Sequence, residues 1–302
     1  MENLTEFPLT ASCNTREVRG RGRRCRHRLL LDYILVSFVG ADAIEIYSYL
    51  FDHLTEDFVT MESSMRGFQH VLSNGSLFIH YDNKGSKDVV VLEIRGRGCR
   101  YLEQQPYHSW KEFFQRVVEA PNHINVELYA FKRLDIAIDS FNNNVLTPKR
   151  VWDYQRKNLI TSRMRSIRFV KEYRVKSGDL SGDSVYLGKR SSDLSILVYD
   201  KRLESGAESV WYRTELRLRN SWGSKAVSSI AGPSFSFEKF VADTLRFNVQ
   251  FRSSLHKRSE LRRQPLAAWY LKYLACIEKL ELCGLNSSLD PKAGDPSVDS
   301  RK

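Results

Sequence analysis

The sequence lacks several patterns that would assign it to a familiar functional class. None of its five cysteines forms a CxxC pair, and its seven histidines show neither His-x-His nor HExxH spacing. A disulfide framework and a zinc site built on thiolates or histidines are therefore not indicated, and we expect reduced thiols. A phosphate loop of the form GxxxxGK is also absent, so nucleotide hydrolysis is not predicted.

Long hydrophobic runs and an excess of acidic residues are absent as well. No stretch of about 18 apolar residues is available to span a bilayer, and the N-terminus lacks the apolar core of a signal peptide. Lys and Arg number 47 against 36 Asp and Glu, which gives a formal net charge of +11. We therefore expect a cytoplasmic protein with a polyanionic partner, and nucleic acid is favoured over membrane.

The N-terminal half predicts strands and helices in alternation. The run DYILVSF from Asp32 has the composition of a buried strand, and Asp42 with Glu45 forms a capping box that opens an amphipathic helix. Two strands flank the turn dipeptide Asn74-Gly75, and a third follows a turn at Lys84-Gly85. Three antiparallel strands in succession predict a meander.

Further elements follow the same logic. A second capping box predicts a helix from Ser109 to Glu119, and Thr147-Pro148 opens a helix that runs to about Ile160. Strands are predicted at 132–140, twice within 184–204 and at 210–219, with helices around 238–247 and 266–282. The predicted fold class is α+β: a mainly antiparallel central sheet with flanking helices and a helical C-terminal part.

Composition divides the chain into four predicted regions: a flexible basic arm at 1–28, a main domain at 29–250, a C-terminal helical region at 251–284 and a disordered tail at 285–302. The arm is either a solvated tail or a non-specific phosphate-binding segment, and the sequence leaves both open. The basic stretch 156–176 contains Phe169 and Tyr173 among its charges, which favours a DNA-facing ribbon over a solvated loop.

Three predicted strands place an acid and arginines together on the face that points away from the core, because alternate residues share a face. The residues are Glu93 and Arg95 in one strand, Arg133, Asp135 and Asp139 in the next, and Arg213, Glu215, Arg217 and Arg219 in the third. Cross-strand ion pairs on a solvated face are one interpretation. The other is an open platform on which carboxylates hold Mg²⁺ or Mn²⁺ and arginines bind phosphate.

Tyr199 is a candidate nucleophile near the end of its predicted strand. Most strand tyrosines are structural, because tyrosine has a high β propensity. A free phenol of pKa about 10 is on the order of 0.1% ionised at pH 7, so attack on phosphorus needs a metal or a cationic neighbour. We expect Lys201 on the same strand face as Tyr199, and His80 is either a base, an outer metal ligand or a structural histidine.

Four motifs in order resemble the replication initiation factor family of rolling-circle initiators and related relaxases. They are VVVLEIRGRGCRYLE, RLDIAIDS, VYLGKRSSDLSILVYDKRLE and WYRTELRLR, and the resemblance covers roughly residues 30–250. It implies an endonuclease and strand transferase that nicks one strand of an origin, stays bound through a 5′-phosphotyrosyl bond and leaves a 3′-OH primer. The His-hydrophobe-His metal motif of other rolling-circle nucleases is absent, which favours carboxylate ligands for the metal.

The resemblance implies roles for particular residues. LVYDKRLE matches the family segment that resembles IRIYNKK, which assigns the nucleophile to Tyr199, although Asp200 stands where the family often has Asn. The RLDxAxD strand aligns with Asp135 and Asp139, and the family's RxE strand with Arg213 and Glu215. We infer from the shared strand face that the metal ligands come from Glu93, Asp135, Asp139 and Glu215. Arg190, Lys201 and Arg213 are predicted to stabilise developing charge, and the predicted DNA-binding residues are Arg95, Arg133, Arg165, Arg168, Lys189 and Arg217.

The predicted function is initiation of rolling-circle DNA replication, with origin DNA carrying a single-stranded nick site in a hairpin as substrate. Unwinding then requires a separate helicase from the host or the element, and a homodimer is a further expectation from the family. Two alternatives remain open. One is a relaxase for conjugative transfer or mobilisation, and the other is a non-catalytic DNA-binding regulator whose acidic face merely balances its arginines.

Overall fold

The computed structural model describes residues 16–20, 23–52, 54, 58–62, 65–82, 89–105, 109–142, 145–232, 236–253 and 260–284. The predicted turn at Lys84-Gly85 and the predicted tail at 285–302 lie outside these residues. Within the described part of the chain, no helix is both long enough and apolar enough to cross a membrane.

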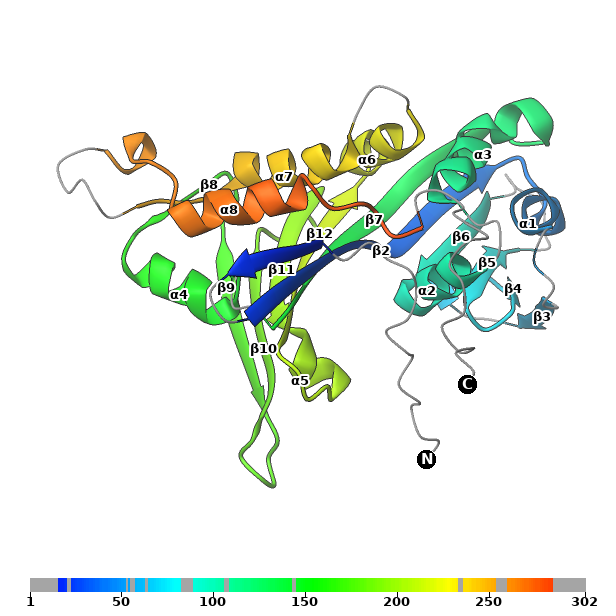
Figure 1. The fold of residues 1–302 in the computed structure, drawn as a ribbon. Coiled ribbons are helices and arrows are strands. Elements are labelled where there is room, and N and C mark those ends of the chain that lie inside the picture. The colour runs from blue at the N-terminus through cyan, green and yellow to red at the C-terminus, as the bar shows by residue number, and fades with distance from the viewer. Residues whose placement is uncertain are drawn as a thin grey trace, which may run out of the picture.

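The centre of the molecule is one antiparallel sheet, which contains eleven strands of the described chain in the order β3-β4-β5-β6-β2-β7-β12-β11-β10-β9, with β1 paired to β2 (Figure 1). These strands are β1 (Arg16–Gly20), β2 (Arg23–Val39), β3 (Val59–Glu62), β4 (His70–Ser73), β5 (Leu77–Tyr81), β6 (Val89–Arg95), β7 (Leu128–Phe141), β9 (Ile167–Tyr173), β10 (Leu180–Leu187), β11 (Leu194–Asp200) and β12 (Trp211–Arg219). A separate pair joins β8 (Ile160–Ser162) to β13 (Val249–Phe251).

The helices are α1 (Ala43–Phe51), α2 (Gly96–Gln104), α3 (Trp110–His123), α4 (Pro148–Arg156), α5 (Lys201–Ser205), α6 (Ser221–Ala231), α7 (Phe237–Asn248) and α8 (Ala268–Ile277), with short 3-10 turns η1 (Met65–Gly67) and η2 (Leu261–Arg263). Helices α3, α6, α7 and α8 lie in a row along one side of the sheet (Figure 1). The hairpin of β9 and β10 projects from the other side (Figure 1). The predicted α+β class with a mainly antiparallel sheet is confirmed.

Local signals in the sequence explain where the helices start. Asp42 accepts a hydrogen bond from the Ile44 backbone N–H at 2.7 Å, and Thr147 accepts one from the Arg150 N–H at 3.1 Å. These caps satisfy backbone donors that the first helical turn leaves unpaired. The Asn74-Gly75 hairpin also forms as predicted, with Gly75 at φ +84°.

Several predicted elements differ from the structure. Arg16–Gly20 and Arg23–Val39 are strands, whereas the sequence predicts a flexible arm up to residue 28, because pairing with β7 extends to Arg26 and does not require apolar alternation. Helices α2 and α6 are not predicted from the sequence, because their glycines and serines have low helix propensity. Reduced thiols are found at Cys99 and Cys276, but the prediction is wrong for Cys283, which is disulfide-bonded.

The two faces of the sheet differ in chemistry. One face carries the apolar residues that pack under the helices, including Ile94, Ile136 and Leu216. Tyr273 of α8 donates a hydrogen bond to Thr214 on this face, at 3.2 Å. The opposite face, which we call the polar face, carries the predicted acids and arginines. Beyond α8, the chain returns to the sheet, where Leu282 forms a bridge with Leu29 of β2.

Candidate active site

One residue from each of four neighbouring strands forms a row across the polar face. Tyr199 on β11 lies opposite Arg213 on β12, Arg213 lies opposite Asp139 on β7, and Asp139 lies opposite Arg28 on β2. Directly opposite residues point to the same face of a sheet, so the four side chains are neighbours. Strand alternation therefore predicted the shared face correctly for Arg213 and Asp139.

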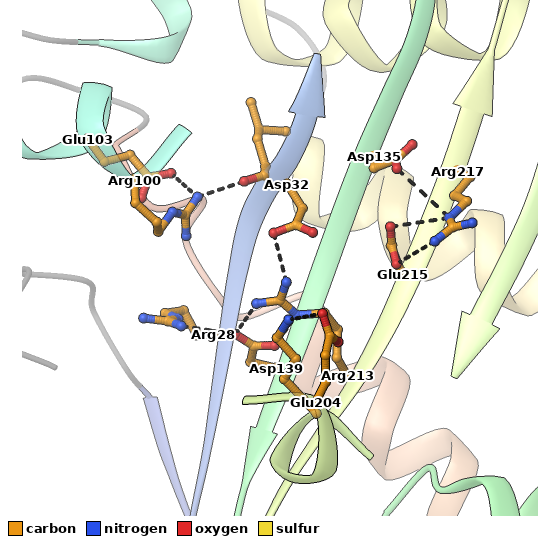
Figure 2. A network of polar contacts seen from close by, with 12 residues as sticks. Arg28, Asp32, Arg100, Glu103, Asp135, Asp139, Glu204, Arg213, Glu215 and Arg217 are labelled. Carbon is orange, nitrogen blue, oxygen red and sulfur yellow. Dashed lines mark hydrogen bonds and ion pairs between the residues drawn. The ribbon is translucent and has the colours of Figure 1, made fainter. Parts of the chain in front are cut away.

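Ion pairs hold this row together (Figure 2). Asp139 accepts two hydrogen bonds from Arg213, at 2.6 Å from Nε and 3.0 Å from Nη2, and a third from Arg28 at 3.0 Å. Arg213 also donates through Nη1 to Asp32, at 2.7 Å. Burial alone would raise the pKa of Asp139, but the neighbouring charge and hydrogen bonds of Arg213 and the charge of Arg28 hold it well below its usual range.

Tyr199 stands at the end of the row and is partly exposed. Its ring lies 5.7 Å from the Lys201 ammonium, measured from the ring centroid to Nζ, and no hydrogen bond to its hydroxyl is found among the described residues. Burial raises the pKa of Tyr199, whereas the charge of Arg213 lowers it, and the net direction is upward. The phenol is therefore protonated in the free protein and needs a base or a bound substrate to lose its proton.

The chain turns sharply after Tyr199. Asp200 ends β11 and caps α5, because its carboxylate accepts a hydrogen bond from the Arg202 N–H at 3.1 Å. Asp and Asn are equally good caps, so Asp200 preserves this turn where the family often has Asn. The expectation that Lys201 shares a strand face with Tyr199 is wrong: Lys201 is the first residue of α5, and its ammonium pairs with Glu204 at 2.9 Å.

A second group of charges lies further along the same face. Arg217 on β12 faces Asp135 on β7, and it donates two hydrogen bonds to Glu215, both at 3.2 Å. Arg133 donates to Asp135 at 2.8 Å through Nε. Burial raises the pKa of Asp135, and the negative charge of Glu215 raises it further. Arg133 and Arg217 lower it, but the net direction is upward. Figure 2 shows Asp135, Glu215 and Arg217 beside one another, apart from the row that ends at Tyr199.

Glu93 on β6 is surrounded by four hydrogen-bond donors. They are the Tyr33 hydroxyl at 2.8 Å, Arg66 Nε at 2.7 Å, Arg95 Nε at 2.9 Å and His80 Nε2 at 3.2 Å. Burial alone would raise the pKa of Glu93, but these four hydrogen bonds hold it far below its usual range. His80 is fully buried, so it is placed as a partner of Glu93 and not beside Tyr199.

The predicted metal ligands do not assemble into a metal site. Among the described residues, no three His, Cys, Asp or Glu side chains are placed to hold an ion together. Glu93, Asp135, Asp139 and Glu215 are each buried and each paired with at least one arginine, which fills positions that a cation would need. The observed arrangement is closer to the ion-pair interpretation. That interpretation expected the ion pairs to be exposed to solvent, whereas the acids in them are buried.

The remaining predicted site residues fall into two groups. Arg133 and Arg217 are partly buried ion-pair partners, whereas five others are exposed: Arg95, Arg165, Arg168, Lys189 and Arg190. Arg165 and Arg168 belong to the hairpin region of β9, where the Arg168 guanidinium lies 4.6 Å above the Tyr186 ring. Arg190 is in the turn before β11, where its carbonyl accepts a hydrogen bond from Arg219. Arg219 lies six residues, roughly 20 Å, along β12 from the Arg213 that faces Tyr199. The structure therefore does not bring Arg190 to the nucleophile.

Three residues of the site are not predicted from the sequence: Arg28, Asp32 and Arg66. Asp32 lies at a register shift between β2 and β7, which directs its carboxylate toward Arg213 (Figure 2). One available signal was that Asp32 is the only charged residue in the run LLLDYILV. Such a lone charge needs a partner if it is buried. Arg66 lies outside any strand, so alternation carries no information about it.

This chain is similar to known proteins, of which two are compared with it below. A relative named "Putative DNA relaxase NicK" from Bacillus subtilis (strain 168) is 26% identical over 213 residues, which is 67% of this chain and 58% of that protein. The chain thus spans a little over half the length of this relative. A solved rolling circle replication initiator protein from Geobacillus stearothermophilus superposes with a TM-score of 0.75 at 23% identity, over 84% of this chain and 98% of that one. That likeness shows the shared fold.

Two family models match in adjacent ranges. The model described as rolling circle replication initiation protein N-terminal domain matches residues 28–116, which contain Arg28, Asp32 and Glu93. The model described as replication initiation factor matches residues 129–285, which contain Asp139, Tyr199 and Arg213. The second range covers more than half of the 302 residues. The chain therefore belongs to the replication initiation factor family.

Proposed function

We propose that this protein initiates rolling-circle DNA replication by nicking one strand of an origin with Tyr199. The observation that carries the proposal is that Tyr199 is partly exposed at the end of a buried ion-pair row, beside the ammonium of Lys201. Membership of the replication initiation factor family supports the same assignment.

In the proposed reaction, the Tyr199 oxygen attacks the scissile phosphorus. The new bond joins that oxygen to phosphorus, and the bond from phosphorus to the 3′-oxygen breaks. The phenol proton passes to a base, which delivers a proton to the 3′-oxygen so that it leaves as a 3′-hydroxyl. Among the described residues no carboxylate is hydrogen-bonded to the Tyr199 hydroxyl, and Glu204, Asp32 and Glu215 are each paired with a cation, so none of them is assigned as that base. Joining is the reverse, with a 3′-hydroxyl as nucleophile.

The two cations near Tyr199 have different proposed roles. Lys201 supplies positive charge beside the ring, and its side chain is 18% exposed, so it can approach a bound phosphate. Arg213 is committed through Nε, Nη1 and Nη2 to Asp139 and Asp32. We therefore assign Arg213 a positioning role that keeps the row in register and lowers the energy of the Tyr199 phenolate at short range.

A divalent cation remains a prediction from the sequence. Mg²⁺ or Mn²⁺ would supply charge neutralisation on the phosphate oxygens. Because the four predicted ligands are held by arginines, no step of the proposed mechanism is routed through them. For DNA contacts outside the active row, we propose the exposed cations Arg165, Arg168 and Lys189 near the β9–β10 hairpin, whose two-stranded shape fits a DNA groove.

A relaxase of a mobile element is the second candidate function, favoured by the similarity to the protein named as a DNA relaxase. The same residues would then act on a transfer origin in place of a replication origin. Transfer genes beside the coding sequence would support this alternative, and a hairpin-forming repeat beside it would support replication. In either case unwinding is expected to need a separate helicase, and a homodimer and a cytoplasmic location remain predictions.

The experiment that tests the chemistry traps the covalent intermediate. Wild-type protein is incubated with Mg²⁺ or Mn²⁺ and single-stranded oligonucleotides that tile the DNA around the gene, and adducts are detected by a gel shift under denaturing conditions. We expect an adduct that Tyr199→Phe abolishes. Tyr186→Phe is the matched control, because Tyr186 lies on the neighbouring strand with a cation over its ring. The proposal would be refuted if the adduct persisted in Tyr199→Phe. It would also be refuted if wild-type protein formed no adduct with any of the oligonucleotides.

A further inference from the structure

Outside the active row, one cluster on the polar face combines fixed cations with solvent exposure. We call it the Glu93 cluster, and it consists of Tyr33, Arg66, His80, Glu93 and Arg95. One arginine is enough to neutralise a carboxylate. Here two arginines bind the same one, so the three charged side chains leave one positive charge uncompensated. This surplus sits at the surface, because the Arg66 and Arg95 side chains are 35% and 45% exposed while Glu93 is 3% exposed.

The way in which the arginines bind leaves their outer ends available. Arg95 reaches Glu93 through Nε, and among the described residues its two terminal nitrogens have no hydrogen-bond partner. Arg66 also donates through Nε to Glu93 and through one terminal nitrogen to the Tyr33 hydroxyl. Its other terminal nitrogen has no hydrogen-bond partner among the described residues. A guanidinium held by Nε presents its terminal N–H groups outward in a fixed direction. Paired N–H groups of this kind match the oxygens of a phosphate.

Several contacts fix these guanidinium groups in place. Arg95 lies over the Phe78 ring at 4.9 Å, and Arg133 lies over the Tyr33 ring at 4.4 Å. His80 is fully buried on the neighbouring strand β5, on the same face as Glu93, with Nε2 toward the carboxylate and Nδ1 without a hydrogen-bond partner among the described residues. Glu93 is therefore held in position by a side chain of the adjacent strand. Side chains that are already ordered lose less entropy when they bind a ligand.

The backbone at Arg66 is in an unusual conformation. Its φ is +59°, in the left-handed region that is unfavourable for a residue with a side chain. Arg66 is one of only four such residues other than glycine in the described chain, and the other three are asparagines, which tolerate this region better. The strained turn η1 directs the Arg66 guanidinium toward Glu93 and Tyr33. Strain of this kind is typical of ligand-binding positions.

We propose that Arg66 and Arg95, positioned by Glu93, form a binding subsite for a backbone phosphate of single-stranded DNA. The proposal rests on the proposed function, because it extends the DNA path from Tyr199 across the same face of the sheet. Glu93 is four strands from Tyr199 and six residues along the register, which is roughly 25–30 Å in a flat sheet. The subsite would therefore hold a nucleotide several positions from the scissile phosphate.

The position of the cluster favours this ligand over a purely structural role. An ion pair that only stabilised the fold would need one arginine, and exposed pairs contribute little to stability. The cluster also lies in the range matched by the rolling circle N-terminal domain model, whereas Tyr199 lies in the other matched range. A strand bound at both places would contact both ranges, which ties the DNA to the whole sheet.

Affinity measurements can test the subsite without any chemistry. In a Tyr199→Phe background, fluorescence anisotropy measures binding of a labelled oligo(dT) of about 20 nucleotides, longer than typical single-strand sites. Arg95→Ala is expected to weaken binding roughly tenfold, as for loss of one charge-assisted contact. It should also reduce the slope of log affinity against log salt by about 0.7 per lost phosphate contact. Arg66→Ala is expected to act in the same direction.

The matched control is Arg116→Ala. Arg116 is 47% exposed and pairs with Asp52, so its removal changes net charge by the same amount, but it lies on α3 away from the polar face. We expect unchanged affinity and salt slope. If Arg95→Ala and Arg116→Ala give equal results, the subsite does not exist. Thermal melting of each variant shows whether a loss of affinity reflects unfolding.

Glu93→Gln separates positioning from net charge. It adds one positive charge, so simple electrostatic attraction predicts tighter DNA binding. The subsite predicts weaker binding, because Arg66 and Arg95 lose the carboxylate that orients them. Tighter binding would overturn the positioning role of Glu93. If Arg95→Ala weakened binding only to a duplex of the same length and not to the single strand, the assignment of the subsite to single-stranded DNA would be overturned. None of these results depends on whether Tyr199 is the nucleophile.

Discussion

Arg213 and Asp139 face each other across β12 and β7, and both oxygens of the Asp139 carboxylate accept hydrogen bonds from the Arg213 guanidinium. Asp139 is completely buried and Arg213 is 5% exposed. This pair lies between the candidate nucleophile and β2. Arg28 and Asp32 of β2 bind the pair, and these contacts join the two parts of the sheet that the family models match separately. Its energetics should therefore govern both folding and the position of Tyr199.

Asp139→Asn should destabilise the fold by about 3–5 kcal/mol, because removal of one partner leaves buried arginine charge uncompensated. Urea unfolding monitored by circular dichroism measures the change in free energy of unfolding. Asp153→Asn is the control, since Asp153 forms an exposed ion pair with Lys149 on α4 and its loss should change the free energy of unfolding far less. If the two variants lost the same free energy of unfolding, the buried ion pairs of the row would contribute no more to stability than an exposed pair.

Stability should fall as pH drops below about 6.5 because of His27. Burial lowers the pKa of His27 to about 4, whereas an unfolded histidine titrates near 6.5. As pH falls, His27 is therefore protonated in the unfolded chain before it is protonated in the folded protein. The stabilisation from neutral, buried His27 is fully present above about pH 6.5, and it decreases by about 1.4 kcal/mol per pH unit toward pH 4. Unfolding titrations across this range measure the slope.

His27→Gln should flatten the pH dependence over that window. The control is His123→Gln, because His123 is 55% exposed at the end of α3. Below about pH 4 the depressed pKa of Asp139 adds a further loss in the same direction, as its carboxylate becomes protonated. A His27→Gln curve that runs parallel to wild type between pH 6.5 and 4 would contradict the assignment.

Much of the polar face could be predicted from alternation alone. The registers place Arg213 opposite Asp139 and Arg217 opposite Asp135, on the faces that a period of two assigns to them. Helix starts at Asp42, Ser109 and Thr147 were also predictable, because a cap depends on residues close in sequence. Such local rules suffice where both partners lie in one element.

The burial of the acids could not be predicted in this way. Alternation shows which residues share a face, but it does not show that arginines of the same and neighbouring strands bury the acids in ion pairs. Asp32 and Arg213 are 181 positions apart and meet only because a register shift turns Asp32 toward β12. Likewise Lys201 was assigned to a strand, since the pattern of β11 gives no sign that Asp200 begins a helix at once.

Glu93 should not be a ligand of the metal that nicking is predicted to require. Its carboxylate already accepts four hydrogen bonds, so Glu93→Gln is expected to leave the Mn²⁺ concentration for half-maximal nicking unchanged within about twofold. The measurement is a Mn²⁺ titration of adduct formation at saturating DNA, which removes the effect of weaker DNA binding. A rise of about tenfold or more, within the range seen when a metal's supporting residues are lost, would restore Glu93 to the metal site.

Lys201 should accelerate the attack of Tyr199 by stabilising negative charge that develops on the phenol oxygen and the phosphate. Its Nζ lies 5.7 Å from the Tyr199 ring centroid, and α5 fixes it there through the Asp200 cap. Lys201→Ala is expected to slow adduct formation at saturating DNA by roughly ten- to a hundredfold, somewhat less than the loss of an oxyanion-hole donor, and Lys201→Arg should recover part of the rate. Lys225→Ala is the control, because Lys225 lies 5.2 Å from the Trp222 ring on α6 and has no proposed role. If Lys201→Ala weakens DNA binding but leaves the rate at saturation unchanged, Lys201 binds substrate and does not act on the chemical step.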